Sequence, residues 1–331
     1  MRQQRELFNL LKKEMPNEHH KPYVVGIGDL TLDIVTSIRS FPINANQFYP
    51  TPELYQNPGG RCNFLIELSR LQIHAIALDT IGTDEWGDFL CSTLKNEGID
   101  LSLVQKSEET CRSIVLSDPY GNHSFIGKFG SNAPYQFQEN CYSTISGASA
   151  VFASGYNFQN LNSENLAIEI LEKAKKIGVI RGFDTGPLFH FLDENKKTKI
   201  YNLCSHLFLT KEELNSLGIK KISKFFDYGI EVVVVKMGMK GCKIFTNKNE
   251  KFSIHGLKVP VTDTTAAGDC FDAGFIVGLI KGLPLMLCAT LANCVGAATV
   301  KKLGGGVNVP TLEEVLNVAK EFKICADQFN L

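Results

Sequence analysis

The sequence predicts an α/β protein whose core has three layers, with helices on both faces of a mostly parallel β-sheet. Two observations favour this class. Short apolar runs alternate with segments of helical period along most of the chain, as expected of β-α-β units. The run "EVVVVKMG" is rich in β-branched residues on both faces, which suits a fully buried parallel strand.

The first half of the chain supplies strands and helices in alternation. Residues 23–30, "YVVGIGDL", form an apolar run ending in glycine-rich sequence, which predicts a buried strand. In residues 59–72, "GGRCNFLIELSRLQ", apolar positions recur at helical spacing after Asn63. A second strand is expected at "AIALDTIG", and the helix "EWGDFLCSTLKNEG" is expected to end at Gly98.

The alternation resumes after Ala148. Further strands are expected at "ASAVFAS", "GVIRGFD", "HLFLT", "EVVVVKMG", 242–246 and 252–255. Helices are expected at 163–176, 192–204, 267–281 and 285–301. Because no repeat or linker divides this core, we expect a single domain over residues 22–331, preceded by an N-terminal extension of residues 1–21 with a short amphipathic helix ending near Pro16.

Two segments break the alternation and predict a small β-sheet beside the main one. Residues 36–57 hold three prolines and show no helical period. Residues 110–130 contain "CRSIVLS" and "HSFIGK" on either side of a turn at 118–122, which is typical of a hairpin. A small sheet that stands off the core in this way is the layout expected of a lid.

Composition excludes several classes of function. The chain has 331 residues, 44% of them hydrophobic and 21% charged, and its net charge is −1. We therefore expect neither a nucleic acid nor an anionic membrane as partner. The ten cysteines include no Cys-x-x-Cys pair, so they predict buried thiols in a reducing compartment rather than a zinc site. With neither a signal peptide nor an apolar run of membrane-spanning length, we expect a cytoplasmic protein.

The stretch "DTTAAGDCFDAGF", residues 263–275, predicts an anion site at the start of a helix. The amides of a first helical turn lack partners, and their dipoles favour a negative ligand. The small residues Ala266, Ala267 and Gly268 would let such a ligand reach the backbone. Asp269 at the same place suits a general base that accepts a proton from an attacking hydroxyl. The alternative is a tight turn in which Asp269 only stabilises the helix dipole.

Four motifs, in the expected order, give the chain a resemblance to the ribokinase-like, or PfkB, carbohydrate kinases over about residues 23–315. "DTTAAGDCFDAGF" resembles the signature Asp-Thr-x-Gly-Ala-Gly-Asp, and "GDLTLD" the first substrate strand. "NPGGRCN" resembles the Gly-Gly…Asn signature, and "VKMGMKG" the nucleotide-binding strand and turn. The sequence around these motifs most resembles that of plant-type members of the family. Two departures are Ala266 in place of a glycine, which is tolerable at negative φ, and a "GGRCN" spacing one residue shorter than in ribokinase.

The resemblance implies ATP-dependent phosphorylation of a hydroxymethyl group on a sugar. Asp269 would be the general base, and residues 266–269 would form an anion hole. Asp33 falls where the family grips sugar hydroxyls, and its place just after an expected strand suits a ligand site. Asp29 could do the same. Substrate contacts are also implied for Gly59, Gly60 and Asn63, although Asn63 is equally an N-cap candidate.

The same resemblance implies a nucleotide site at Lys236, Gly238 and Gly241, with Asn293 near the adenine. Glu213, in "LTKEEL", would organise Mg²⁺ through water, but Thr-x-x-Glu is also a capping box. Mg²⁺ would bridge the β- and γ-phosphates of ATP. K⁺ is expected near "DTT" and "GGGVN", where glycines allow the chain to wrap around an ion.

Two other functions remain open at the level of the sequence. The family includes nucleoside kinases, which stacking aromatics in the pocket would distinguish from sugar kinases. A protein with the kinase fold could also have lost catalysis and serve as a binding or scaffold module. The identity of the sugar or nucleoside is not encoded in a recognisable motif, and a homodimer formed through the exposed lid sheet is a further expectation.

Overall fold

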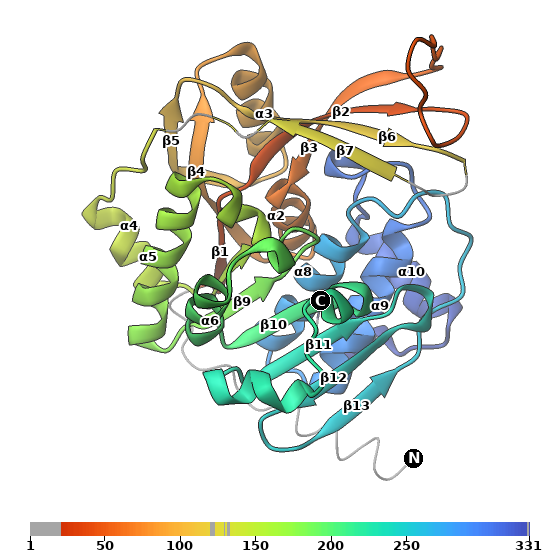
Figure 1. Ribbon diagram of the computed structural model, residues 1–331. Coiled ribbons are helices and arrows are strands. Elements are labelled where there is room, and N and C mark those ends of the chain that lie inside the picture. The colour runs from red at the N-terminus through yellow and green to blue at the C-terminus, as the bar shows by residue number, and fades with distance from the viewer. Residues whose placement is uncertain (1–20, 120–122, 129, 131–132, 330) are drawn as a thin grey trace.

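The computed structural model describes residues 21–119, 123–128, 130, 133–329 and 331. The helix expected near Pro16 and the centre of the turn expected at 118–122 lie outside this part of the chain. Within it, the two sheets and the helices form one continuous body (Figure 1).

The main sheet has nine strands among the described residues, in the order β13-β12-β11-β10-β9-β8-β1-β4-β5. They are β1 (Tyr23–Ile27), β4 (His74–Gly82), β5 (Asp100–Ser107), β8 (Ala150–Ser154), β9 (Ile180–Asp184), β10 (His206–Thr210), β11 (Val232–Lys236), β12 (Cys242–Thr246) and β13 (Lys251–Ile254). Only the pairings of β12 and β13 at one edge are antiparallel. The expected mostly parallel sheet is therefore confirmed.

Helices cover both faces of this sheet (Figure 1). One face carries α2 (Arg61–Arg70), α3 (Glu85–Asn96), α8 (Ala267–Ile280), α9 (Leu285–Thr299) and α10 (Leu312–Glu321). The other carries α4 (Glu139–Gly147), α5 (Leu161–Ile177), α6 (Glu194–Leu203) and α7 (Lys211–Ser216). A separate hydrophobic core fills each interface, so the expected three-layer α/β/α arrangement is confirmed.

A second sheet of four strands, in the order β3-β2-β6-β7, stands beside the carboxyl ends of the main strands (Figure 1). Its strands are β2 (Leu30–Ser37), β3 (Leu54–Gly60), β6 (Cys111–Ser117) and β7 (His123–Lys128). The expected second, small sheet is present, and β2 and β6 pair in parallel at its centre. Residues 38–53 of the first expected lid segment form no strand.

The buried strand expected over residues 23–30 is present as β1, but it is shorter than expected. β1 ends at Ile27, and Gly28 and Asp29 follow with φ angles of 62° and 61°. Two successive left-handed residues redirect the chain out of the main sheet and into β2. Asp33 therefore lies inside a strand of the small sheet, not beyond the carboxyl end of a main strand.

The expected start of the helix after Asn63 was also late. α2 begins at Arg61, with Gly60 as its N-cap residue, so Asn63 lies in the first turn rather than at the cap. β5 was not expected from the sequence, because "DLSLVQKS" at a sheet edge lacks a continuous apolar run.

All ten cysteines are free, and seven of them are buried. None of the helices in the described ranges is long and apolar enough to cross a bilayer.

Candidate active site

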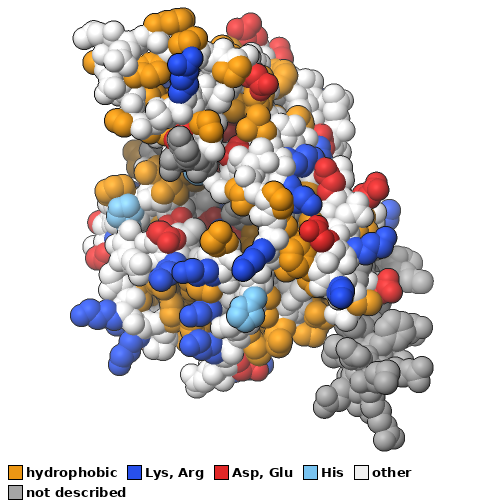
Figure 2. Space-filling view, turned by 90° about the vertical axis from the view of Figure 1, so that its right-hand side faces the viewer, with side chains coloured by type: hydrophobic (Ala, Val, Ile, Leu, Met, Phe, Trp, Pro, Cys, Tyr) orange, Lys and Arg blue, Asp and Glu red, His pale blue; other side chains and the backbone are white. Residues whose placement is uncertain are grey.

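A cavity of about 610 Å³ lies between the small sheet and the carboxyl ends of the main strands. Figure 2 shows the recess beneath the upper lobe that the small sheet forms. Many of the expected site residues line this cavity: Asp29, Asp33, Gly60, Asn63, Ala266 and Asp269. The fold thus brings together residues from three distant parts of the chain.

The elbow, residues 266–269, begins helix α8 at the wall of this cavity. Ala266 has a φ of 63°, so the negative φ that would make alanine easily tolerated here is absent. A left-handed alanine costs about 1–2 kcal/mol. The Ala267 amide donates to Thr264 O at 3.2 Å, whereas the amides of Gly268 and Asp269 have no hydrogen-bond partner among the described residues. Fewer backbone amides are therefore free to bind an anion at this helix start than the sequence suggested.

Asp263 fixes the loop before the elbow. One of its carboxylate oxygens accepts from both the amide and the hydroxyl of Thr265, each at 2.9 Å. The other accepts from the amide of Gly304 at 2.8 Å. A buried carboxylate with these donors ties the elbow to the glycine-rich segment 304–306.

Asp269 is partly exposed to the cavity, and Asn63 Nδ2 donates to its Oδ2 at 3.0 Å. Burial raises the pKa of this carboxyl, and the negative charge of Asp184 adds to the increase. Arg61, the Asn63 hydrogen bond and Lys236 oppose it. A carboxylate with a raised pKa, in a cavity large enough for a small molecule, can accept a proton from a bound hydroxyl.

Asp33 lies on β2 with 8% of its surface exposed. Burial raises the pKa of its carboxyl to about 7, with the nearby Ser113 side chain opposing the shift and the negative charge of Asp269 adding to it. A Cβ at Gly59, on the neighbouring strand, would overlap the Asp33 carboxylate. Gly59 therefore makes room for Asp33 rather than for a ligand directly.

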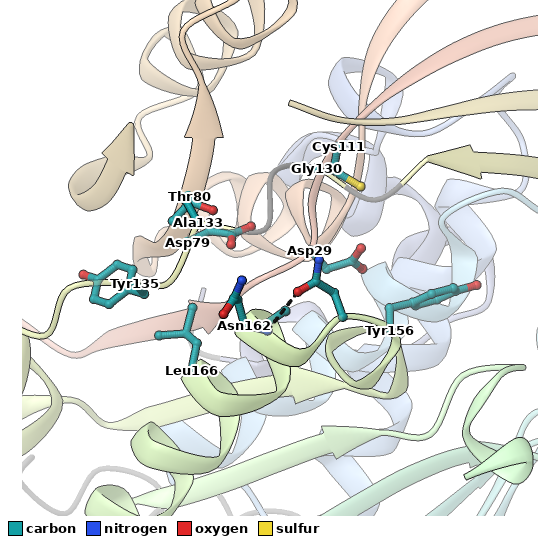
Figure 3. Close-up of a pocket in the computed structure, with 12 residues that line it drawn as sticks. Asp29, Asp79, Thr80, Cys111, Gly130, Ala133, Tyr135, Tyr156, Asn162 and Leu166 are labelled. Carbon is teal, nitrogen blue, oxygen red and sulfur yellow. Dashed lines mark hydrogen bonds between the residues drawn. The ribbon is translucent and has the colours of Figure 1, made fainter. Parts of the chain in front are cut away.

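Asp29 adjoins the same cavity, and burial likewise raises the pKa of its carboxyl to about 7. Gly60, at a φ of 54°, approaches it closely: a Cβ there would lie 3.1 Å from Asp29 Cγ and 3.0 Å from Thr31 Oγ1. A smaller cavity of about 50 Å³ extends behind Asp29 toward Asp79 and Tyr135 (Figure 3). The two cavities share Asp29, Cys111 and Tyr156.

Lys236 is buried at the end of β11, against the elbow. Its Nζ lies 3.0 Å from Asp184 and 3.0 Å from Asp272, and 3.4 Å from where a Cβ of Gly268 would be. The two carboxylates raise the pKa of Lys236 and outweigh its burial. The charged Lys236 ammonium group therefore lies behind the elbow, between the carboxylates of Asp184 and Asp272, and does not line the large cavity.

Gly238, Gly241 and Asn293 do not line the large cavity. Gly238 and Gly241 flank a turn after β11, with φ angles of 54° and 87°. A Cβ at Gly241 would collide with the backbone of residues 254–256, and Asn293 Nδ2 donates to His255 O at 3.1 Å. Gly241 and Asn293 are thus neighbours, grouped around His255.

Glu213 forms the capping box that its spacing predicts: its amide donates to Thr210 Oγ1 at 3.1 Å, and its Oε2 accepts from the Thr210 amide at 2.8 Å. The same Oε2 accepts from the Thr185 hydroxyl at 2.9 Å. Burial and the nearby Asp184 raise the pKa of this carboxyl.

Sequence reasoning missed several residues of the site. Asp184 ends β9, where the rule that ligands gather at the carboxyl ends of parallel strands could have found it. Asp272 lies one turn after Asp269, and a charged residue in so apolar a helix was a visible signal. Arg61 is 2% exposed, with its guanidinium 4.9 Å from the centre of the Phe152 ring, and nothing in the sequence indicates that burial.

Residues 22–312 match the family described as pfkB family carbohydrate kinase. The chain belongs to this family. The match covers the small sheet, the elbow and the turn after β11 together, so the resemblance to the family is confirmed.

Proteins with similar sequences are named as kinases of different phosphoryl acceptors. A protein of Arabidopsis thaliana named "Probable fructokinase-6, chloroplastic" is 27% identical over 320 residues, 89% of this chain and 81% of its own. A nucleoside kinase of Methanothermobacter thermautotrophicus is 24% identical, covering 88% and 94%. Arabidopsis thaliana ribokinase, solved with ribose and ATP, superposes with a TM-score of 0.76 at 21% identity, covering 91% and 99%.

As a member of this family, the chain is an enzyme, a sugar or nucleoside kinase that transfers a phosphoryl group to an alcohol. Its fold is ribokinase-like.

Proposed function

We propose that the protein transfers the γ-phosphoryl group of ATP to a hydroxymethyl group of a sugar, with Asp269 as the general base. The observation that carries this proposal is the shared cavity of Asp33 and Asp269, which belong to the small sheet and to the start of α8. An acceptor held by Asp33 would lie between the two sheets, with its reacting hydroxyl toward Asp269.

The elbow supplies the electrostatic part of the reaction. The unpartnered amides of Gly268 and Asp269 would stabilise charge on the transferred phosphoryl group, and the α8 dipole acts in the same direction. Lys236 lies directly behind Gly268 and adds a fixed positive charge, which Asp184 and Asp272 partly offset. Closure of the small sheet over the acceptor would exclude water, which otherwise competes as phosphoryl acceptor.

The nucleotide would extend from the elbow toward Gly238, Gly241 and Asn293. Glu213 fits a role in holding Mg²⁺ through water: Oε2 is occupied by the cap, while Oε1 has no hydrogen bond within the described ranges. Bound Mg²⁺ would neutralise charge on the β- and γ-phosphates. Asp184, which lines the large cavity together with Asp269, is a further candidate for this role.

A monovalent cation, K⁺, would bind where the "DTT" loop meets the glycine segment. Asp263 holds these two pieces together, and Gly304 and Gly306 adopt φ angles of 72° and 58°, which let the backbone turn tightly at this point. We expect activity in K⁺ buffer to exceed that in a bulky organic-cation buffer several-fold. Equal rates in the two buffers would exclude a required cation.

A nucleoside kinase is the second candidate, and one observation favours it. Phe125 from the small sheet and Tyr156, Pro187 and Leu188 from the core line the cavity. A base could stack against such walls, since aromatic side chains bury flat rings favourably. A sugar alone needs fewer apolar contacts, so the acceptor panel described next must contain both classes.

The deciding test is ADP release from ATP and Mg²⁺ across sugars and nucleosides, followed by Asp269→Asn with the best acceptor. We expect kcat to fall about 10²- to 10⁴-fold with the fold and nucleotide affinity retained, because an amide cannot accept the hydroxyl proton. Asp88→Asn, an exposed aspartate on α3, is the control. Turnover on no acceptor would favour a non-catalytic scaffold, and a variant within a few-fold of wild type would remove Asp269 from catalysis.

We also propose that two copies associate through the small sheet. Large hydrophobic side chains are exposed on the sheet at Leu54, Ile114 and Ile126, and in the loop between β2 and β3 at Ile43 and Phe48. Figure 2 shows hydrophobic side chains gathered on this lobe. The edge strand β7 also leaves backbone groups for pairing. The free thiols fit the cytoplasm as the site of action.

A further inference from the structure

The glycine segment, residues 304–307, lies between the small sheet, helix α2 and the loop before the elbow. From the small sheet, Asn57 Nδ2 donates to Gly305 O, and Asn57 Oδ1 accepts from the Val307 amide at 3.1 Å. From α2, Asn63 Oδ1 accepts from the Gly306 amide at 2.7 Å. One short segment is thus fixed by side chains from two elements that otherwise belong to different parts of the fold.

Glycine is required at this contact. A Cβ at Gly305 would lie 2.5 Å from Asn63 Oδ1 and 3.0 Å from the Ala266 methyl group. A Cβ at Gly306 would overlap the amide of Asn57, and the residue has a φ of 58°. The segment therefore packs with its backbone directly against both asparagines and against the elbow.

Asn63 connects this segment to the proposed base. Its Oδ1 accepts from Gly306 and its Nδ2 donates to Asp269 Oδ2, so both ends of one buried amide are in use. If the Gly306 amide moved, the rotation of the Asn63 side chain that keeps Nδ2 on Asp269 would no longer be fixed. Asn63 thus acts on Asp269, although the sequence suggested a contact with substrate.

We infer that Asn57 is a positioning residue for the proposed phosphoryl transfer: it holds the glycine segment, which holds Asn63, which orients Asp269. The inference rests on the proposed function of Asp269. We call the contacts from Asn57 through the glycine segment and Asn63 to Asp269 the clamp. Asn57 is opposite Asp33 in the β2–β3 register, so the strand pair that would bind the acceptor also carries the first residue of the clamp. Acceptor binding that orders these two strands would therefore align the base as well.

The clamp predicts a change in the titration of Asp269, because Asn63 donates to its ionised form. Other charges face this carboxyl from every element packed around it, and they are unchanged by a substitution at Asn57. The titratable groups concerned are Arg61 on α2, Asp184 on β9, Lys236 on β11, Asp33 on β2, Asp29 before β2 and Tyr156 after β8.

The experiment compares Asn57→Ala with Asn202→Ala. Asn202 serves as the control, since it is an exposed asparagine on α6 that lines neither the large cavity nor the glycine segment. For Asn57→Ala we expect kcat about tenfold lower, the acid limb of kcat shifted to higher pH and KM for ATP within twofold of wild type. The control should keep the rate and the pH profile.

A purely structural role for Asn57 predicts a different result. In that case Asn57→Ala lowers Tm but leaves kcat and the acid limb as in wild type, which overturns the inference. The double variant Asn57→Ala/Asn63→Ala adds a second criterion: the effects on log kcat should be strongly non-additive if the residues act in series, and additive if they act separately. If Asn57→Ala does not fold, Asn57→Asp, which retains the acceptor for Val307, replaces it with the same expectations.

Hydrogen exchange separates failure of this inference from failure of the proposed function. Asn57→Ala should speed exchange in residues 304–309 and also at the elbow, residues 263–271, whether or not any acceptor is phosphorylated. Wild-type protein without kinase activity would reject the proposed function and leave this measurement to decide the clamp. Faster exchange confined to 304–309, with the elbow unchanged, would reject the clamp even in an active kinase.

Discussion

Asp33 and Asp29 each depend on a glycine of the neighbouring strand. The Asp33 carboxylate occupies the volume where a Cβ of Gly59 would be, and a Cβ at Gly60 would collide with Asp29 O and lie 3.1 Å from Asp29 Cγ. Burial in that position raises both pKa values to about 7. Glycine is therefore needed at both positions of the "GG" pair because larger residues would collide with the two neighbouring aspartates.

Asp33→Ala should raise KM for the acceptor about tenfold to a hundredfold and leave KM for ATP nearly unchanged. A hydrogen bond to a charged group is worth about 1.5–3 kcal/mol, and the vacated space beside Gly59 offers no substitute. Initial-rate kinetics with both substrates varied would measure this. Asp100→Ala, on β5 and outside the cavity, is the control. An unchanged acceptor KM would separate Asp33 from the acceptor site.

Helix α2 carries another acid that the proposed chemistry does not use. Glu67 is fully buried one turn after Asn63, and neither of its carboxyl oxygens has a hydrogen-bond partner in the part of the chain that the structure describes. Burial raises its pKa well above the ordinary value, with Arg70 opposing and Glu314 adding. A neutral carboxyl inside α2 destabilises the fold whenever the solution favours its ionised form.

Glu67→Gln should therefore change how stability depends on pH. The folded pKa of Glu67 exceeds the unfolded one, so its contribution is fully present below about pH 4.5 and is lost as pH rises toward the folded pKa. Gln does not titrate, so the variant should gain stability relative to wild type as the pH rises above about 4.5, by a few degrees in Tm. Calorimetry at several pH values tests this. A Tm difference independent of pH would contradict it.

At the scale of the molecule, the small sheet has two different faces. Asp33, Ser113 and Gly127 are paired across β2, β6 and β7 and face the cavity, so Ile114 and Ile126 point the other way. Ile114 and Ile126 are 39% and 62% exposed, respectively. A sheet with acids inside and aliphatic side chains outside suits both a lid and an interface.

Ile126→Lys should weaken association of two copies without abolishing turnover. A charge at the centre of an apolar contact is costly, and Ile126 lies on the edge strand that pairing would use. Sedimentation velocity over a range of protein concentrations would measure the oligomeric state. Lys251→Ala on β13, far from the small sheet, is the control. A wild-type chain that remains monomeric at every concentration would reject the lid dimer.

The sequence by itself determined the layers and the family. Hydrophobic period is local, so β8 to β12 and helices α5, α8 and α9 could be predicted to within a few residues. The elbow could be recognised because an anion site needs small residues and a helix start next to each other in the chain. Glu213 could be predicted as a cap for the same reason, since its partner Thr210 is three residues away.

Only the tertiary structure decided which residues meet. Gly306 follows Asn63 by 243 residues and Val307 follows Asn57 by 250, so no local pattern encodes these hydrogen bonds. The positive φ of Gly28 and Asp29, which sends β2 out of the main sheet and carries Asp33 with it, is set by the packing around that turn. Burial, and with it the raised pKa of each cavity acid, depends on surrounding elements drawn from the whole chain, so it could not be read from the residues alone.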